Sequence, residues 1–364
     1  MTLHVTAIVG ARPNFMKVAP LSWAADCRDD IQIEIVHTGQ HYDRNMSQLF
    51  FDELSIPEPS INLGVGPGSH ASQTAEIMVR FEEHVLAQRP DVVLVVGDVN
   101  STIACSLVSA KLGIPIVHVE AGLRSGDRAM PEEINRVLTD AISDVLYVTE
   151  ESGRTNLINE GVDESRIEFV GNVMIDTLLK NRKKADASDV LEKNGLEAGQ
   201  YGVVTIHRPS NVDNEEILRG IWGALAGISE NAKLVFPVHP RTRSRLADLG
   251  LSASDGLKLI DPLGYLDFLK LQASALMILT DSGGIQEEAV ILGVPCLTMR
   301  ENTERPVTIE VGGNRLVGTD PAEITRRATA IIRGEVAPPT IPTYWDGRAA
   351  ERVVESLVTR FGKA

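Results

Sequence analysis

Three kinds of pattern are scarce or missing in this 364-residue chain, and each absence excludes a class of protein. The only cysteines are Cys27, Cys105 and Cys296, and their wide spacing fits neither a disulfide framework nor a Cys-x-x-Cys metal or redox site. No apolar stretch reaches the roughly 18–20 residues of a membrane span, and the N-terminus lacks the basic region of a secretory signal. The sequence therefore predicts a soluble protein of the reducing cytoplasm.

Positive charge is also scarce. Thirty-five lysines and arginines stand against 50 acidic residues, which gives a net charge of −15 without any basic run. Nucleic acids and anionic membranes are therefore disfavoured as partners, and an anionic ligand would need cations and backbone N–H groups gathered locally. The eight histidines show no zinc-binding spacing, so no metal is expected.

Short β-branched segments alternate with longer helical patterns along the whole chain. In the first half these segments are HVTAIVG, IQIEIVH, DVVLVVG, IPIVHVE, DVLYVTE and IEFVG, and after a polar stretch at 180–200 they are YGVVTIH, KLVFPVH, LKLI, LMILT and PCLTM. This alternation is typical of a parallel, doubly wound α/β sheet. Because the chain is long for one core, we predict two Rossmann-like domains, 1–171 and 172–347.

Ligands of such sheets bind beyond the carboxyl ends of the strands, and charged or polar motifs follow nearly every predicted strand. In the first half these motifs are ARPNFMK, TGQHYD, DVNST and EAGLRS, and in the second half they are HRPSNVD, HPRT and DSGGIQEE. Their position predicts one ligand-binding cleft between the two domains.

A phosphate-binding turn is predicted at Ser282, Gly283 and Gly284, which open a helical pattern. Glycines at a helix start let a phosphate approach free N–H groups, and the helix dipole favours its charge. An ordinary serine cap with a glycine turn is the alternative. Glu288, one turn further on, would hold the hydroxyls of a ribose, and Arg305 would add a cation for the same diphosphate.

Two other motifs carry cations or a histidine. Arg12 and Lys17 lie at the first strand-to-helix turn, where two cations in an acidic protein suggest an anionic ligand. A solvated surface is an equal alternative. His207 ends a strand of the second half. A loop histidine satisfied by neighbours is the alternative, but Arg208 and Asn211 accompany His207 and favour a functional role.

The stretch HVEAGLRSGDRAMPEEINR, residues 118–136, carries the acids that we single out. Pro131 suits a helix start, and an apolar stripe is expected to face the core. Its members are Ile134, Val137, Leu138, Ala141, Ile142 and Val145. Glu132 and Arg136, four residues apart, share a different face, where Arg136 would hold Glu132 in place. Acids complementing a helix dipole would explain any one carboxylate, but Asp98, Glu120 and Glu132 all follow strands predicted to be neighbours, which makes them general acid/base candidates.

With these motifs assembled, the chain resembles the non-hydrolysing UDP-N-acetylglucosamine 2-epimerases over its full length. The motifs that carry the resemblance, in the family's order, are GARPNFMKVAPL, TGQHYD, GDVNST, HVEAGLRS, PEEINR, GNVMIDTL, HRPSNVD, PVHPRT, DSGGIQEEA and TERP. The resemblance implies a glycosyltransferase-B-like fold whose C-terminal helix, 348–364, joins the first domain. It also implies a homodimer without cofactor that reversibly inverts C2 of UDP-N-acetylglucosamine (UDP-GlcNAc), giving UDP-N-acetylmannosamine (UDP-ManNAc) for cell-surface polysaccharide.

Residue by residue, the family's catalytic acids match Asp98, Glu120 and Glu132, and its active-site histidine matches His207. The positions that the resemblance assigns to UDP-sugar binding are Arg12, Lys17, Arg136, Arg208, Asn211, His239, Leu263, Phe268, Ser282, Gly283, Gly284, Glu288 and Arg305. Leu263 stands where other members have glutamine, and the loop SGDRAM is shorter than in the best-known bacterial members.

Other outcomes remain open from the sequence. A hydrolysing enzyme of the same fold would release free sugar and UDP, a relative could act on a diacetamido uronic acid nucleotide, and a glycosyltransferase or a nucleotide-sugar sensor would use the same nucleotide half. Many bacterial members are activated by UDP-GlcNAc at a second site. Gln40 is kept there, but Asp43 and Ser72 replace a glutamine and an arginine, so we expect no such activation.

Overall fold

The computed structural model describes residues 2–39 and 58–362. The chain forms two compact units, Met1–Lys180 with Thr343–Ala364, and Asn181–Pro342. Each unit is built around a parallel sheet with flanking helices, which confirms the predicted α/β class with two doubly wound sheets. Within the described residues, no helix combines the length and the apolar character needed to cross a membrane.

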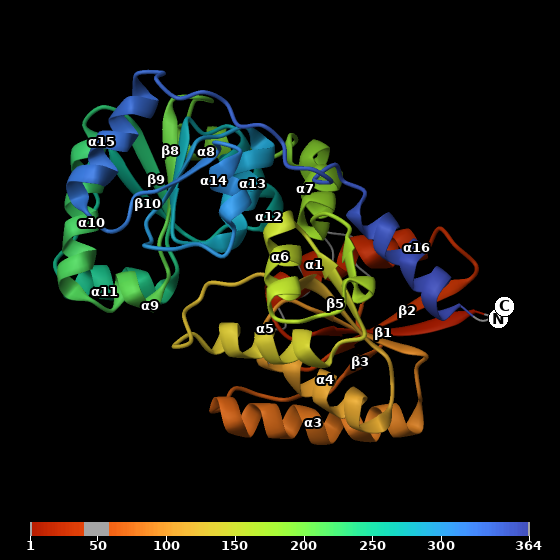
Figure 1. Ribbon diagram of the computed structural model, residues 1–364. Helices are drawn as coiled ribbons and strands as arrows, with labels where there is room; N and C mark the ends of the chain where they lie inside the picture. The colour runs from red at the N-terminus through yellow and green to blue at the C-terminus, as the bar shows by residue number, and fades with distance from the viewer. Residues whose placement is uncertain (1, 40–57, 363–364) are drawn as a thin grey trace. The chain divides into compact units, whose positions relative to one another are not determined.

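The first unit contains a parallel sheet of seven described strands in the order β3-β2-β1-β4-β5-β6-β7 (Figure 1). The strands are β1 (Leu3–Val9), β2 (Ile31–His37), β3 (Ile61–Asn62), β4 (Val92–Val96), β5 (Ile116–Ala121), β6 (Val145–Val148) and β7 (Ile167–Phe169). Every residue of β4 is buried, as expected for a central parallel strand covered on both faces.

Helices cover both faces of this sheet. The order reverses direction between β1 and β4, and right-handed crossovers then place the helices of the two halves on opposite faces. Accordingly α3 and α5 both pack against α4, whereas α1 packs against α16. The helices are α1 (Arg12–Ala25), α3 (His70–Ala87), α4 (Asn100–Leu112), α5 (Pro131–Ile142), α6 (Glu151–Asn159), α7 (Val173–Ala185) and α16 (Ala349–Phe361), with a 3₁₀ turn η1 (Glu164–Arg166).

The second unit contains a parallel sheet of six strands in the order β10-β9-β8-β11-β12-β13. The strands are β8 (Tyr201–Thr205), β9 (Lys233–Pro237), β10 (Leu257–Ile260), β11 (Met277–Thr280), β12 (Cys296–Thr298) and β13 (Asn314–Leu316). The helices are α8 (Val190–Asn194), α9 (Pro209–Val212), α10 (Glu215–Ser229), α11 (Pro240–Asp248), α12 (Tyr265–Ala273), α13 (Gly283–Leu292), α14 (Pro306–Glu310) and α15 (Pro321–Ile332). Separate apolar clusters fill the two faces of this sheet.

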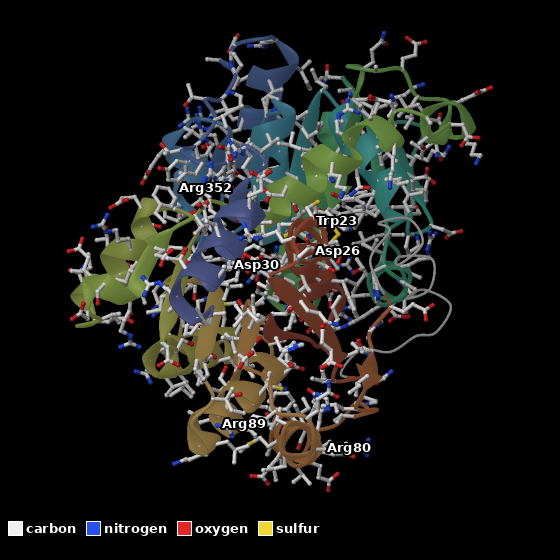
Figure 2. The ribbon with its side chains drawn as sticks, turned by 90° about the vertical axis from the view of Figure 1, so that its right-hand side faces the viewer. Trp23, Asp26, Asp30, Arg80, Arg89 and Arg352 are labelled. Atoms are coloured by element: carbon white, nitrogen blue, oxygen red, sulfur yellow. The ribbon has the colours of Figure 1, made fainter. Side chains whose placement is uncertain are left out.

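The first unit includes more of the chain than the sequence suggested, because α7 begins inside it and the segment before α16 packs on it. The Thr177 hydroxyl donates to the Met16 carbonyl over 2.7 Å. The fully buried Trp345 donates its indole N–H to the Thr149 carbonyl over 3.0 Å. Arg352, labelled in Figure 2, lies over the Tyr344 ring and donates to the Val170 carbonyl. These contacts place the unit's limits at 180 and 343 rather than at 171 and 348.

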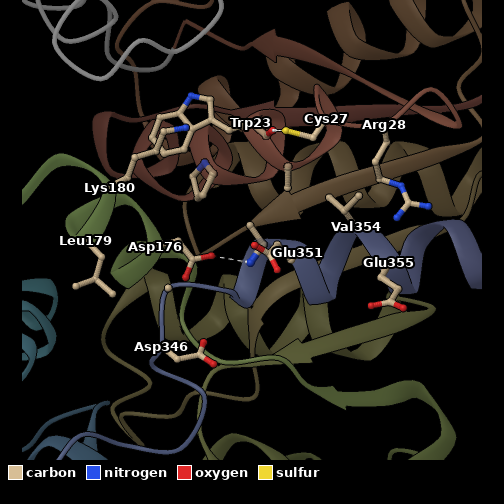
Figure 3. Close-up of a pocket in the computed structure, with 14 residues that line it drawn as sticks. Trp23, Cys27, Arg28, Asp176, Leu179, Lys180, Asp346, Glu351, Val354 and Glu355 are labelled. Carbon is tan, nitrogen blue, oxygen red and sulfur yellow. Dashed lines mark hydrogen bonds between the residues drawn. The ribbon is translucent and has the colours of Figure 1, made fainter.

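Asp176 on α7 caps the C-terminal helix from outside. Its carboxylate accepts the backbone N–H groups of Ala349 (3.2 Å) and Ala350 (2.7 Å), at the start of α16 (Figure 3). The residue borders a cavity of about 660 Å³ lined by α1, α7 and α16. Burial raises the pKa of Asp176 to about 6, although the two N–H groups oppose the shift.

Replacing Asp176 by Asn should remove one component of the pH dependence of stability. Between about pH 4 and pH 6 the folded chain still holds this proton while the unfolded chain has lost it, so the wild type loses stability as the pH rises through that window. The free energy of unfolding of Asp176→Asn relative to the wild type should therefore rise by about 1–3 kcal/mol over that window. Urea unfolding at both ends of the window measures this, with exposed Asp26→Asn as the control; a constant difference would contradict the assignment.

Candidate active site

Two acids lie at the carboxyl edge of the first sheet, on adjacent strands. β4 pairs with β5 in parallel, so the turn that carries Asp98 and the strand end that carries Glu120 are neighbours. The two segments are also joined directly, since the Gly97 N–H donates to the Val119 carbonyl over 3.2 Å. The predicted proximity of these two acids thus has its basis in strand order.

Glu120 is paired with a buried lysine and is held in a rare backbone conformation. The Nζ of Lys17, from α1, contacts its Oε2, and both side chains are less than a tenth exposed. Glu120 has φ of 72°, and the pairing of β5 with β6 shifts register there. A left-handed non-glycine residue is uncommon and strained. Gly97 leaves room for the pair, because a Cβ there would lie 2.9 Å from Lys17 Nζ.

Asn14 of the motif ARPNFMK fixes the first turn, a role that the sequence reading missed. Its Oδ1 accepts the N–H groups of Gly10 (3.2 Å) and Ala11 (2.9 Å), and its Nδ2 donates to the Val96 carbonyl over 3.2 Å. The turn after β1 is thereby tied to the end of β4. Arg12 begins α1, and its predicted role in binding UDP-sugar stays a prediction.

Arg136 bridges two carboxylates, and the expected partner, Glu132, is not one of them. Its side chain is 5% exposed and contacts Asp98 Oδ2 and, over 2.7 Å, Glu133 Oε2. Glu133 also accepts the N–H groups of Ser125 and Gly126, each over 3.0 Å. The expectation that Arg136 holds Glu132 is therefore wrong: Glu133 shapes the loop before α5, while Glu132 is exposed.

The faces of α5 are the reverse of the predicted ones. Its inward face is polar, with Glu133, Arg136, Thr139 and Asp140 buried. The expected apolar stripe instead faces outward: Ile134, Val137 and Leu138 are 42%, 37% and 49% exposed, Ala141 is exposed and Ile142 half-buried, and Val145 belongs to β6. The reason is local, since the buried polar residues of the helix find partners in the loop before it, in Asp98 and in the residues on either side of Glu120.

In the second unit Asp281 organises the turn after β8. This fully buried carboxylate accepts the N–H groups of His207 (3.0 Å) and Arg208 (2.9 Å) and the Nδ2 of Asn211 (3.2 Å). It also lies 3.0 Å from His207 Nδ1. Burial raises the pKa of Asp281, but His207 and the N–H donors outweigh that effect and hold it below its usual value. His207 is thus oriented with about half of its side chain exposed.

Asn211 and His239 have structural partners in this unit. Asn211 is buried and also donates to the Met299 carbonyl over 3.0 Å. His239 precedes α11, and its Nδ1 accepts the Arg241 N–H over 3.4 Å. Their predicted contacts with a UDP-sugar stay predictions.

The start of α13 gathers cationic side chains around one carboxylate. Gly283 lies against Glu304, since a Cβ there would be 2.7 Å from Glu304 Oε1. Glu304 pairs with Arg300 (2.8 Å) and Arg208 (3.4 Å). Burial raises its pKa, but Arg305 and Arg300 outweigh burial and lower the pKa to about 2.

The ordinary serine cap is not what the structure has at this helix. Among the described residues, the Ser282 side chain accepts no capping N–H, and Gly284 lies in the first turn of α13. Arg305 is also paired with Glu287, its Nε lying 2.8 Å from Oε1. These features suit an anion near the helix start.

Glu288 faces the interior of the second unit. Its Oε2 accepts a hydrogen bond from Gln272 Nε2 over 2.8 Å, and burial raises its pKa to about 7. Leu263 and Phe268 are half-buried against the apolar cluster on the same face of the sheet. Contacts of these three side chains with a UDP-sugar stay predictions.

Two other sets of residues complete the comparison with the sequence. Gln40 and Asp43 lie outside the described residues, and exposed Ser72 hydrogen-bonds to Ser69. In residues 2–39 and 58–362, no group of three or more His, Cys, Asp or Glu side chains is placed to hold a metal ion.

The cavity of Figure 3 lies beside the C-terminal end of α1, away from the start of α1 and the turn that Asn14 fixes.

The different roles of Glu132 and Glu133 can be tested by stability. Glu133→Gln should lower the free energy of unfolding by about 2–3 kcal/mol, because a buried charge-assisted hydrogen-bond network loses its acceptor. The matched variant Glu132→Gln should change the free energy of unfolding by less than about 0.5 kcal/mol, as at an exposed position. Urea unfolding of both variants provides the comparison, and equal losses would overturn the assignment.

Comparisons with known proteins agree with one another. The family model for UDP-N-acetylglucosamine 2-epimerase matches residues 24–358. A UDP-N-acetylglucosamine 2-epimerase of Methanocaldococcus jannaschii is 43% identical over 370 residues, which cover 99% of this chain and 100% of that protein. A UDP-2,3-diacetamido-2,3-dideoxy-D-glucuronate 2-epimerase of Pseudomonas aeruginosa is 40% identical and covers 98% of this chain and 99% of its own length.

Solved structures give the same result for the fold. The M. jannaschii UDP-GlcNAc 2-epimerase in complex with UDP-GlcNAc and UDP superposes with a TM-score of 0.90 at 42% identity, covering 98% of this chain and 100% of that one. The UDP-GlcNAc 2-epimerase of Neisseria meningitidis bound to UDP-GlcNAc gives a TM-score of 0.89 at 29% identity, covering 98% and 100%.

Proposed function

Because the chain belongs to the UDP-N-acetylglucosamine 2-epimerase family, we propose that it interconverts UDP-GlcNAc and UDP-ManNAc by inverting C2, without hydrolysis. The observation that carries the proposal is the pair of acids on adjacent strand ends, Asp98 and Glu120, each beside a buried cation. Proton transfer at C2 needs positioned carboxylates, and a departing diphosphate needs positive charge.

The reaction consists of an elimination and its reversal. C2 bears no neighbouring carbonyl, so its proton can be removed only as the anomeric C1–O bond breaks. A carboxylate takes the proton, the C2–H electron pair forms the C1=C2 bond, and UDP leaves with the electron pair of the C1–O bond. The resulting 2-acetamidoglucal then receives a proton at C2 from the opposite face while a UDP oxygen re-forms the bond to C1. The elimination is anti and the addition is syn.

The side chains of the first unit supply candidates for both proton transfers. Asp98, Glu120 and Glu132 are three carboxylates at one edge of the sheet, and two faces of the sugar ring need one acid or base each. Lys17 and Arg136 bring positive charge beside Glu120 and Asp98.

The second unit supplies candidates for nucleotide binding. The start of α13, with Ser282, Gly283 and Gly284, favours a diphosphate, and Arg208 and Arg305 lie close to the same helix. We assign Glu288 to the ribose hydroxyls, which donate to a carboxylate. His207, ordered by Asp281, is the candidate active-site residue of this unit.

We also propose a cytoplasmic homodimer. The outward face of α5 exposes Ile134, Val137 and Leu138, and α3, which flanks α4 on the other side, exposes Val79 and Leu86. Apolar surface on one side of a molecule favours a self-complementary contact about a two-fold axis. All three cysteines are free, as a reducing compartment requires. Sedimentation equilibrium of the purified chain decides between dimer and monomer.

One second candidate has specific support. The 40% identity to the P. aeruginosa enzyme named for UDP-2,3-diacetamido-2,3-dideoxy-D-glucuronate keeps a modified UDP-sugar as an alternative substrate. The chemistry at C2 would be the same. Parallel incubation with both nucleotide sugars, compared by kcat/KM, identifies the preferred substrate.

Incubation with UDP-GlcNAc in D2O tests the proposed reaction. We expect UDP-ManNAc to form and deuterium to appear at C2 of both epimers, because the proton is removed and replaced by groups that exchange with solvent. Proton NMR reports both results. Free sugar plus UDP would instead identify a hydrolase, retention of the C2 proton in UDP-ManNAc would indicate hydride chemistry, and no product would contradict the proposal.

Neutralising Asp98 or Glu120 should separate chemistry from binding. Asp98→Asn and Glu120→Gln should each lower kcat by at least ~10²-fold, the usual size of a general acid/base contribution. UDP affinity, measured by calorimetry, should change little, because both substitutions leave the cations Lys17 and Arg136 in place and the remaining nucleotide contacts are assigned to the other unit. A collapse of UDP affinity at unchanged kcat would show that these acids bind the ligand rather than transfer protons.

A further inference from the structure

A buried histidine joins the two segments that carry the acids. His118 lies in β5, fully buried. Its Nε2 is 2.8 Å from the Gly97 carbonyl oxygen, one residue before Asp98, and its Nδ1 is 2.6 Å from Asp140 Oδ1 on α5. The imidazole thus spans the turn after β4 and the inward face of α5.

Asp140 extends this link to the far side of Glu120. Its Oδ2 accepts the Gly122 N–H over 3.0 Å and lies 2.7 Å from Arg124 Nη1. Burial raises the pKa of Asp140, but His118 and Arg124 outweigh burial and leave it below its usual value. One ionised carboxylate therefore binds residues two before and two after Glu120.

The partners of His118 determine its protonation. A carbonyl oxygen and an ionised carboxylate are both acceptors only, so each ring nitrogen needs a proton in order to donate. Two donating ring nitrogens would make His118 and Asp140 a buried ion pair. Such a pair costs desolvation, and well-packed apolar side chains would often stabilise a fold as well or better. The pair lies between the two segments that carry Asp98 and Glu120, so placing these acids, rather than stabilising the fold, offers a reason for the pair.

We propose that the His118–Asp140 pair positions two of the proposed catalytic acids, holding the Gly97–Asp98 turn through the Gly97 carbonyl and the left-handed Glu120 through His118 and Gly122. The pair touches no substrate and acts through the backbone on either side of the acids. Backbone strain at Glu120 persists only if its surroundings over-determine it, and Asp140 supplies that constraint from both sides. This inference rests on the proposed function, since it concerns the same acids.

The first test does not depend on activity. In protein labelled with ¹⁵N-histidine, the His118 ring should show two protonated nitrogens at neutral pH. The His118 signal is assigned as the one that is absent from the spectrum of His118→Gln. If that variant does not fold, the signal is assigned by its hydrogen-bond coupling to Asp140. A neutral His118 ring in the wild type would overturn the inference.

The second test separates positioning from folding. His118→Gln and Asp140→Asn should lower kcat by about 10- to 100-fold, the cost of a small misplacement of reacting groups, while KM and the affinity for UDP change less than about threefold. The control is His84→Gln in the same unit, where His84 Nε2 lies 3.9 Å from Glu34 Oε2, away from the acids. It should keep the wild-type kcat. Melting temperatures of all three variants are measured alongside.

The results distinguish this inference from the proposed function. A wild type that does not epimerise refutes the proposed function, whatever the histidine spectrum shows. An active wild type whose folded His118→Gln and Asp140→Asn variants keep full kcat refutes the positioning role alone. An equal loss of kcat in His84→Gln also refutes it, because general destabilisation would then account for the effect.

Discussion

The polar inward face of α5 is the constraint on which the acid-bearing edge of the first sheet depends. Glu133, Arg136 and Asp140 are spaced three and four residues apart, so they lie on one side of the helix, and each is buried. A buried charge is tolerated only with partners. Glu133 finds them in the loop before the helix, Arg136 in Asp98, and Asp140 in His118, Gly122 and Arg124.

This constraint connects packing to chemistry. The partners that α5 needs are the turns that carry Asp98 and Glu120, so satisfying the helix also fixes the acids. In the proposed active site this arrangement would pre-organise the acids, and pre-organised charge is more effective than charge that must reorient during reaction. The same requirement turns the apolar residues of α5 outward, where a second copy of the chain is proposed to cover them.

The sequence predicted the fold, and the adjacency of the strands that carry Asp98 and Glu120, better than it predicted side-chain contacts. Strand periodicity identified both sheets, and strand order placed Asp98 beside Glu120. Helical periodicity failed on α5, because a stripe of Ile134, Val137 and Leu138 marks an apolar face without saying whether that face is inward. Arg136 pairs with Glu133 rather than with Glu132 because the loop before α5 brings its N–H groups to Glu133. The spacing of residues along a helix does not predict the path of such a loop. Asp281 stood in a quoted motif, but only its burial beneath His207 reveals its role.

The most direct test of the role given to these acids is a crystal structure of the Glu120→Gln variant with UDP-GlcNAc bound. The sugar C2 should lie within about 3–3.5 Å of side chains at 98, 120 or 132, the approach that proton transfer requires, with at least one such side chain on each face of the ring. A sugar ring whose C2 has none of these three side chains within reach would contradict the assignment.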